Sequence, residues 1–168
     1  HDIPALIACC SSHARARRWR RSPHIDETQR RNLVVVTSNP CPEYALDLWD
    51  WQPGALLFGR HTDLDIVRAL ERVSSGQPKR EPDGLHSVLL PSERLILRYL
   101  PGGIGDKIIA RRLGLSHRTV RNRLVSIFEK LNLENRTQVA MYYTGQWQWL
   151  EGYRDGQRGL EAQRCAAD

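Results

Sequence analysis

A helix between Arg118 and Val125 would carry side chains that can read the edges of base pairs. Positions i, i+3, i+4 and i+7 share one face of a helix, and they hold these four residues: Arg118, Arg121, Asn122 and Val125. In a major groove, guanidinium groups pair with guanine, a carboxamide pairs with adenine, and a small apolar group contacts the thymine methyl. We therefore expect these four residues to contact bases in double-stranded DNA.

Two helical patterns joined by a short turn would position that face. The second helix has an apolar stripe on another side, formed by Val120, Leu124, Ile127 and Leu131. The first helix has its own core side, formed by Ile108, Ile109 and Leu113. Gly114 stands where a left-handed C-cap is expected, and Ser116 stands where the N-cap of the next helix is expected. This pattern predicts a helix-turn-helix. A generic helical hairpin with a charged face is the alternative.

Charge supports the interpretation as a DNA-binding segment. The chain has 25 Lys and Arg residues against 19 Asp and Glu residues, a net charge of +6. Residues 89–147 alone hold ten basic and four acidic residues, so this segment accounts for the whole net charge. A local positive excess is typical of proteins that bind a polyanion. We assign five residues to phosphate contacts, which position a protein without reading sequence: Lys107, Ser116, Thr119, Arg123 and Arg136.

Four blocks of residues extend the pattern over residues 89–138. They are Leu89, Pro91, Glu93, Ile96 and Leu97; Gly103, Lys107, Ile109 and Ala110; Leu113, Gly114, Ser116, Thr119, Val120, Arg121 and Asn122; and Ile127, Lys130, Leu131, Asn135, Arg136, Thr137 and Gln138. In these blocks the chain resembles the LuxR/FixJ-type DNA-binding domain of bacterial response regulators. The resemblance implies a four-helix domain over residues 86–147. Its third helix would lie in the groove, and its fourth helix, 135–147, would contact a second copy.

The chain departs from that family at capping positions. Leu90 replaces the usual threonine N-cap, so the first helix has less support. Gly105 replaces a capping serine and Ile108 replaces its partner glutamate, so a capping box is lost. Arg123 stands where the family usually has histidine, which also resembles the fourth region of sigma factors. The block from Lys130 to Gln138 favours the LuxR type.

Residues 1–76 predict a small α/β domain. Three short apolar runs fit buried parallel strands: Ala5 to Ala8, Leu33 to Val36, and Ala55 to Phe58. Helical patterns follow them, one from Pro42 to Trp51 and one that contains Leu64, Val67, Ala69, Leu70 and Val73 and ends at Gly76. Alternation of strands and helices favours a parallel sheet. Residues 77–85 are interpreted as a linker, and residues 148–168 as a C-terminal tail.

This first domain resembles a shortened, degenerate receiver domain. Residues 34–38 look like a late receiver strand that ends in the switch threonine, here Thr37. Cys9 and Cys10 replace the acidic pair that would hold magnesium, and no aspartate follows Val36 to accept a phosphoryl group. Arg60 is the nearest match to the usual lysine, and its spacing is off by one residue. We therefore expect regulation that does not depend on phosphorylation.

The cysteines leave a second hypothesis open. Cys9, Cys10 and Cys41 would lie near the carboxyl edge of the sheet, where ligands of open α/β folds bind. A thiol- or metal-sensing switch with DNA binding as its output is thus the alternative to a plain transcription regulator. The CxxC spacing is absent, and free cysteines are commonly small buried hydrophobes. We find no nucleophile–base pair, phosphate loop or metal motif, so we expect neither an enzyme nor a cofactor.

Assembly and location complete the expectations. One recognition helix reads only a few base pairs, so we expect a homodimer on DNA through residues 135–147. Val139 should face its own domain, and part of the set Tyr142, Tyr143 and Trp147 should face the second copy. No run of 18 apolar residues and no signal-peptide pattern is present, so we expect a cytoplasmic protein without a membrane span.

Overall fold

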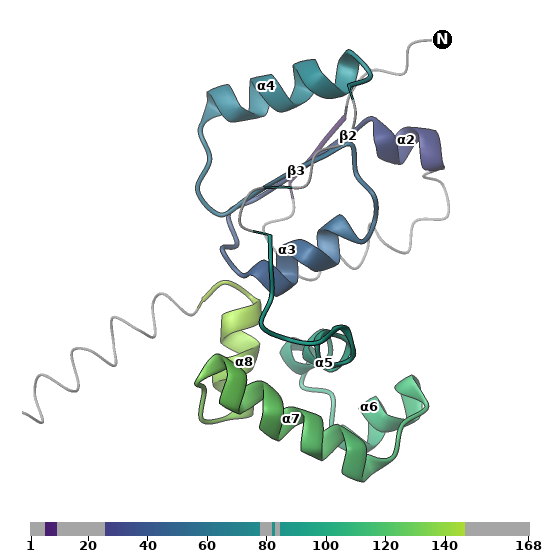
Figure 1. Cartoon of the computed structure of the whole chain (residues 1–168), viewed down its shortest axis with the longest axis vertical. Helices are drawn as coiled ribbons and strands as arrows, with labels where there is room; N and C mark the ends of the chain where they lie inside the picture. The colour runs from purple at the N-terminus through teal and green to yellow at the C-terminus, as the bar shows by residue number, and fades with distance from the viewer. Residues whose placement is uncertain (1–5, 10–25, 78–81, 83–84, 147–168) are drawn as a thin grey trace, which may run out of the picture. The chain divides into compact units, whose positions relative to one another are not determined.

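The computed structural model describes residues 6–9, 26–77, 82 and 85–146, and it contains two compact units divided between Leu90 and Pro91 (Figure 1). The expected architecture, a small parallel-sheet domain followed by an all-helical domain, is confirmed. No helix in the described ranges is long and apolar enough to cross a lipid bilayer. The predicted tail, residues 148–168, lies outside the described residues.

The first unit is built on three parallel strands in the order β1-β2-β3. They are β1 (Leu6–Cys9), β2 (Leu33–Thr37) and β3 (Ala55–Phe58), within a residue or two of the predicted runs. Leu6 pairs with Leu33 and Val34 pairs with Ala55, so β2 lies in the centre. All residues of β2 are buried. A central parallel strand is covered on both faces, which explains why this run is apolar at nearly every position.

Helices cover both faces of this sheet. Figure 1 shows α4 (Asp63–Ser74) on one side of the strands and α3 (Pro42–Trp49) on the other, with the short α2 (Glu27–Arg31) before β2. Between the sheet and α4 lies a core formed by Val34, Val36, Ala55, Ala69 and Val73. The predicted helix end at Gly76 is confirmed by its φ of +64°. Two members of the predicted apolar pattern do not belong to the core, because Leu64 and Val67 are exposed.

The unit boundary falls a few residues after the expected domain start at residue 86. Leu85 and Leu89 are both buried. The Ser87 hydroxyl donates a 2.5 Å hydrogen bond to the buried Glu43 carboxylate on α3 and accepts a bond from the Leu89 N–H. Residues 85–89 therefore belong structurally to the first unit, although the sequence assigns residue 85 to a linker and residues 86–89 to the second domain.

The second unit has the four expected helices. They are α5 (Pro91–Leu97), α6 (Asp106–Leu113), α7 (His117–Leu131) and α8 (Arg136–Tyr143), with a 3-10 turn, η1 (Leu100–Gly102), after α5. Each α-helix of this unit contributes at least one large buried side chain to its core: Ile96, Leu97, Ile109, Val120, Leu124, Ile127, Val139 and Tyr143. The predicted stripe of α7 is confirmed at its first three positions, while Leu131 is half-buried.

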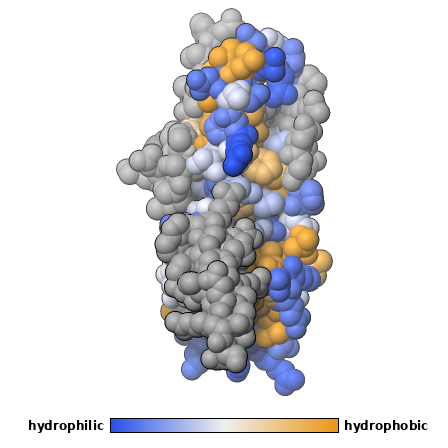
Figure 2. Space-filling model, turned by 90° about the vertical axis from the view of Figure 1, so that its left-hand side faces the viewer, coloured by the Kyte–Doolittle hydropathy of each residue, from blue (hydrophilic) through white to orange (hydrophobic). Residues whose placement is uncertain are grey.

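Two expectations for side chains of this unit are wrong. Ile108 is 48% exposed, because its neighbour Ile109 occupies the core side of α6. Tyr143 is 1% exposed, so it is a core residue and not a contact for a second copy. Val139 is buried, as expected, and Trp147 lies outside the described residues. On the face shown in Figure 2, hydrophobic side chains form separate patches among hydrophilic ones. Single exposed apolar residues are normal on a protein surface.

Candidate nucleic-acid interface

The turn between α6 and α7 is set by local hydrogen bonds. Gly114 ends α6 in the left-handed region, with φ 65° and ψ 31°. The Ala110 carbonyl accepts from both the Gly114 N–H and the Leu115 N–H, the latter at 2.9 Å, and these bonds close the helix end. The Ser116 hydroxyl then accepts from the Thr119 N–H at 3.0 Å and caps α7. Both capping roles predicted from the sequence are confirmed, and they fix where α7 begins.

The outward face of α7 brings together the four side chains assigned to base contacts. Three of them are exposed polar residues, and the fourth, Val125, is 54% exposed. An open hollow of about 510 Å³ is lined by these four residues and by His117: Arg118, Arg121, Asn122 and Val125. The buried stripe of α7 points the other way, since Val120 and Ile127 have no exposed surface. The face is therefore free for a ligand while the rest of the helix is held by the core.

A clamp between α5 and α7 sets the orientation of that face. The Glu93 carboxylate is buried, and it accepts hydrogen bonds from Lys130 Nζ at 2.8 and 3.0 Å. It also accepts one from the Ser126 hydroxyl at 2.8 Å. Because charge-assisted bonds are stronger than neutral ones, these three contacts hold the second half of α7 against α5. Lys130 is thus a structural residue, although its charge adds to the local positive field.

Four of the five residues assigned to phosphate contacts lie on α6, on α7 or at the N-cap of α7, and the fifth, Arg136, makes contacts within the second unit. Lys107 is exposed in the first turn of α6, and Ser116 and Thr119 share a 2.8 Å bond between their hydroxyls at the start of α7. Arg123 is half-buried. Arg136 has another role, because its guanidinium is paired with Asp106 at 2.5 Å and also donates to the Ile104 carbonyl. This pair joins the start of α8 to the start of α6.

Two basic residues near the turn were missed in the sequence. Arg111 is exposed and follows Lys107 at i+4, so both lie on one side of α6. Arg112 lies over the ring of Tyr99, 5.7 Å from its centroid, which holds that guanidinium in place. The helical spacing of Lys107 and Arg111 was the available signal. The contact of Arg112 with Tyr99 joins two different elements, so no local sequence pattern indicated it.

The carboxyl ends of the strands in the first unit contain no phosphoryl-acceptor aspartate among the described residues. Thr37 and Asn39 are buried there. The Asn39 N–H donates to Thr37 Oγ1 at 3.2 Å, and Asn39 Oδ1 accepts from the Cys41 N–H at 2.9 Å. These bonds use the polar atoms of the segment to shape the turn into α3. The described residues also hold no group of three or more side chains that could bind a metal ion.

Cys41 is placed as a core residue. Its side chain is 2% exposed, and its thiol donates to a Glu43 carboxylate oxygen at 3.4 Å. Burial raises the pKa of the Cys41 thiol well above its ordinary value, and the nearby negative charge of Glu43 raises it further. A thiol that stays protonated is a poor nucleophile and a poor metal ligand. Cys9 ends β1, and Cys10 lies outside the described residues.

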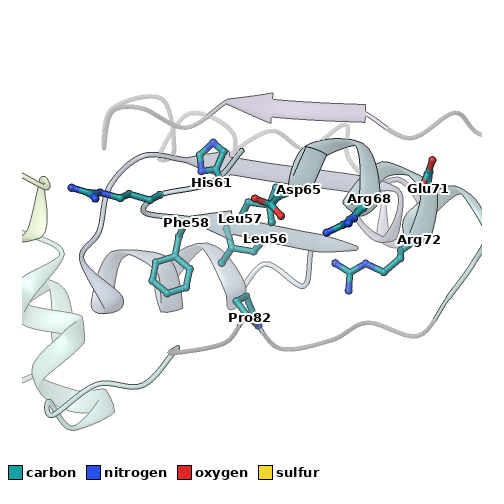
Figure 3. Close-up of a pocket in the computed structure, with 10 residues that line it drawn as sticks. Leu56, Leu57, Phe58, His61, Asp65, Arg68, Glu71, Arg72 and Pro82 are labelled. Atoms are coloured by element: carbon teal, nitrogen blue, oxygen red, sulfur yellow. The ribbon is translucent and has the colours of Figure 1, made fainter. Parts of the chain in front are cut away.

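A second hollow, of about 570 Å³, lies beside β3 and α4 (Figure 3). Arg68 and Arg72 point into it near Leu56 and Pro82, and Glu71 also belongs to its lining. The pKa of the Asp65 carboxyl is lowered by a hydrogen bond from the Thr62 backbone, because Asp65 completes the capping box of α4. Charges of both signs on an exposed helix are typical of a solvated face.

Comparison with known proteins agrees with this geometry. Residues 87–143 match the sequence profile of the family described as "Bacterial regulatory proteins, luxR family". Transcriptional regulatory protein YdfI of Bacillus subtilis is 34% identical over 76 residues, which are 45% of this chain and 35% of that protein. The DNA-binding transcriptional activator DevR/DosR of Mycobacterium tuberculosis is 40% identical over 58 residues, which are 34% of this chain and 27% of that protein.

Other similar proteins are longer or more distant. An HTH-type transcriptional regulator of Mycobacterium tuberculosis is 36% identical over 90 residues, which are 54% of this chain and 10% of that protein. The chain thus spans between about a tenth and a third of the length of these relatives. A solved structure of RcsB from Salmonella enterica serovar Typhimurium bound to promoter P1flhDC has a TM-score of 0.46 and 21% identity, over 86% of this chain and 77% of RcsB. Residues 87–143 of this chain, which fold as a helix-turn-helix, are similar to the luxR family of bacterial regulatory proteins.

Proposed function

We propose that this chain is a sequence-specific DNA-binding regulator of transcription, with α7 as the recognition helix in the major groove. The observation that carries the proposal is the outward face of α7, where Arg121 and Asn122 are exposed beside Arg118 and Val125. The buried residues Val120, Leu124 and Ile127 lie on the opposite side. Arginine and asparagine forks match the edges of guanine and adenine. Lys107, Ser116 and Thr119 supply phosphate contacts that set the register.

Selection of bound sites from random duplex DNA tests this proposal. On the selected site, Arg121→Ala should lose about 1–3 kcal/mol and relax the preference at one position. Lys107→Ala should weaken all sequences about equally and flatten the dependence of log K on log salt by about one unit. Arg68→Ala, an exposed arginine on α4, is the matched control and should change neither. Equal binding of selected and random duplexes by the unmodified chain would refute the proposal.

Binding as a dimer through α8 is the second element of the proposal. Two domains on half-sites about one helical turn apart multiply the affinity of one domain. Because Val139 and Tyr143 are buried, the opposite face of α8 is the one that can contact a second copy, and it holds exposed Thr137 and half-buried Met141. Met141→Glu should weaken binding to a two-half-site duplex and leave a lone half-site unaffected. Analytical ultracentrifugation that finds one copy per two-half-site duplex at saturation would exclude the dimer.

We further propose that this regulator does not use aspartate phosphorylation. The support is chemical, since Thr37 ends β2 and Ser38 and Asn39 follow it where an acceptor aspartate would be needed, and Cys9 ends β1. Small phosphodonors with magnesium should leave the protein unlabelled and its DNA affinity unchanged. Stoichiometric, acid-labile labelling would contradict this.

The thiol- or metal-sensing alternative is not favoured by Cys41, whose burial and raised pKa both suppress reactivity. Thiol titration of the folded protein and analysis of bound metal separate the two functions. A reactive thiol or a stoichiometric metal that changes DNA affinity would support the sensor.

A further inference from the structure

The outward face of α7 contains one apolar residue that folding does not explain. Val125 is 54% exposed, and it lies on the side of α7 opposite the buried residues Val120 and Ile127. A lone exposed apolar side chain would be unremarkable by itself. Val125, however, lines the same hollow as Arg121 and Asn122, where every other lining group is polar.

Resting on the proposed function, we propose that Val125 reads the C5 methyl group of a thymine in the major groove. A valine side chain neither donates nor accepts a hydrogen bond, so it cannot read the polar edges of base pairs. Among the groups that base pairs present in the major groove, the thymine methyl is the apolar one. The partner of Val125 is therefore determined by chemistry once α7 lies in the groove.

The position of that thymine follows from helix geometry. Val125 comes four residues after Arg121, and a helix rises about 1.5 Å per residue, so the two side chains are separated by about 6 Å along α7. Stacked base pairs are about 3.4 Å apart, so the thymine lies about two base pairs from the base that Arg121 reads.

The next turn of α7 shows where the contact surface ends. Glu129 is exposed four residues after Val125, on the same face of the helix. Its carboxylate would be repelled by phosphates, so the part of α7 that enters the groove stops between these two residues. Val125 is consequently the last residue of the reading surface.

The expected effect is that of one buried methyl group. Removing a methyl from an apolar contact costs about 0.8 kcal/mol, which corresponds to an affinity change of about fourfold. Deoxyuridine pairs with adenine as thymidine does and lacks only that methyl. Replacing the sensitive thymine by uracil should therefore weaken binding about fourfold, and replacing any thymine outside the reading surface should have no effect.

The experiment substitutes uracil for each thymine of the selected site in turn and measures affinity for matched duplexes. Val125→Ala should bind the thymine and uracil duplexes equally, because alanine is too short to reach the methyl. Val125→Ile should keep the discrimination. Leu95→Ala, at a 41% exposed apolar residue on α5, is the control and should discriminate as the unmodified chain does. Alanine is a strong helix former, so Val125→Ala should not unfold α7.

A cytosine arm separates methyl readout from effects of uracil on DNA shape. At the sensitive position, replacing the A·T pair by G·C and then methylating C5 of that cytosine should restore affinity about fourfold, and only when Val125 is present. The inference would be overturned if every uracil duplex bound as tightly as the unsubstituted duplex, or if Val125→Ala kept the same preference for thymine. A selected half-site without a thymine near the base read by Arg121 would also overturn it. In these cases specific DNA binding would persist. Failure of the proposed function would instead appear as no sequence preference at all.

Discussion

Gly105→Ser should stabilise the DNA-binding unit, since Gly105 is an N-cap without a capping side chain. It precedes α6 with φ −65° and ψ 152°, values that any residue adopts, and its side-chain position accepts no hydrogen bond. A Cβ added there would meet no atom within 4 Å. Serine can therefore enter without strain, and its hydroxyl can accept a hydrogen bond from a backbone N–H of the first turn.

The size of the effect has two parts. Exchanging glycine for serine at an N-cap contributes a few tenths of a kcal/mol. Removing glycine from a position with ordinary backbone angles restricts the unfolded chain and contributes about 0.4–1 kcal/mol. Together they predict a gain of about 1 kcal/mol, which raises the melting temperature of a unit of this size by about 4–8 °C.

Thermal unfolding followed by circular dichroism measures this gain, and hydrogen exchange in α6 and α7 assigns the transition to the second unit. Gly114→Ala is the matched control: its surroundings are equally open, yet its φ is +65°, so alanine there should lose about 1–2 kcal/mol. Gly105→Ala separates the hydroxyl from the backbone effect. A melting temperature that is unchanged or lowered in Gly105→Ser would refute the reasoning.

Three further predictions concern charged and titratable groups. Glu93→Gln should lower the free energy of unfolding of the second unit by about 1.5–3 kcal/mol in urea, and Lys130→Met should lower it more, because a buried carboxylate then lacks the Lys130 cation. An equal or smaller loss for Lys130→Met would contradict the clamp between α5 and α7. Cys41 should resist alkylation until the chain unfolds, as mass spectrometry can show; rapid alkylation of native Cys41 would show that the thiol is accessible. Because folding raises the pKa of this thiol, the free energy of unfolding should fall as the pH rises past the ordinary pKa of a thiol. Since folding lowers the pKa of Asp65, its capping bond should stabilise α4 above the ordinary pKa of a carboxyl group, and this stabilisation should be lost as the pH falls through the lowered pKa. Hydrogen exchange in α4 should therefore depend less on acid pH in Asp65→Asn than in the unmodified chain; equal acid dependence would show that the cap does not form in solution.

Much of the second unit could be predicted from the sequence because the relevant forces are local. The apolar period of α7 determines which side is buried, and that in turn determines that Arg121 and Asn122 face outward. Gly114 and Ser116 determine where one helix ends and the next begins, since capping bonds span only three or four residues. The three strands of the first unit were equally visible, because buried parallel strands are apolar throughout.

Which side chains meet across the fold was decided by the tertiary structure alone. Arg136 was expected to contact phosphate, but Asp106, 30 residues earlier, pairs with it. Tyr143 was expected at an interface, and the packing of the second unit buries it instead.

The same holds for the first unit. A cysteine next to a strand end suggests a reactive thiol, and only the structure shows that Cys41 is enclosed beside Glu43. Ser87 belongs to the segment that the sequence assigns to the second domain, yet its hydroxyl bonds to Glu43, 44 residues away. Periodicity and capping act over one or two turns of the chain and can be read from neighbours in sequence. Ion pairs and burial depend on residues that become neighbours only when the chain folds.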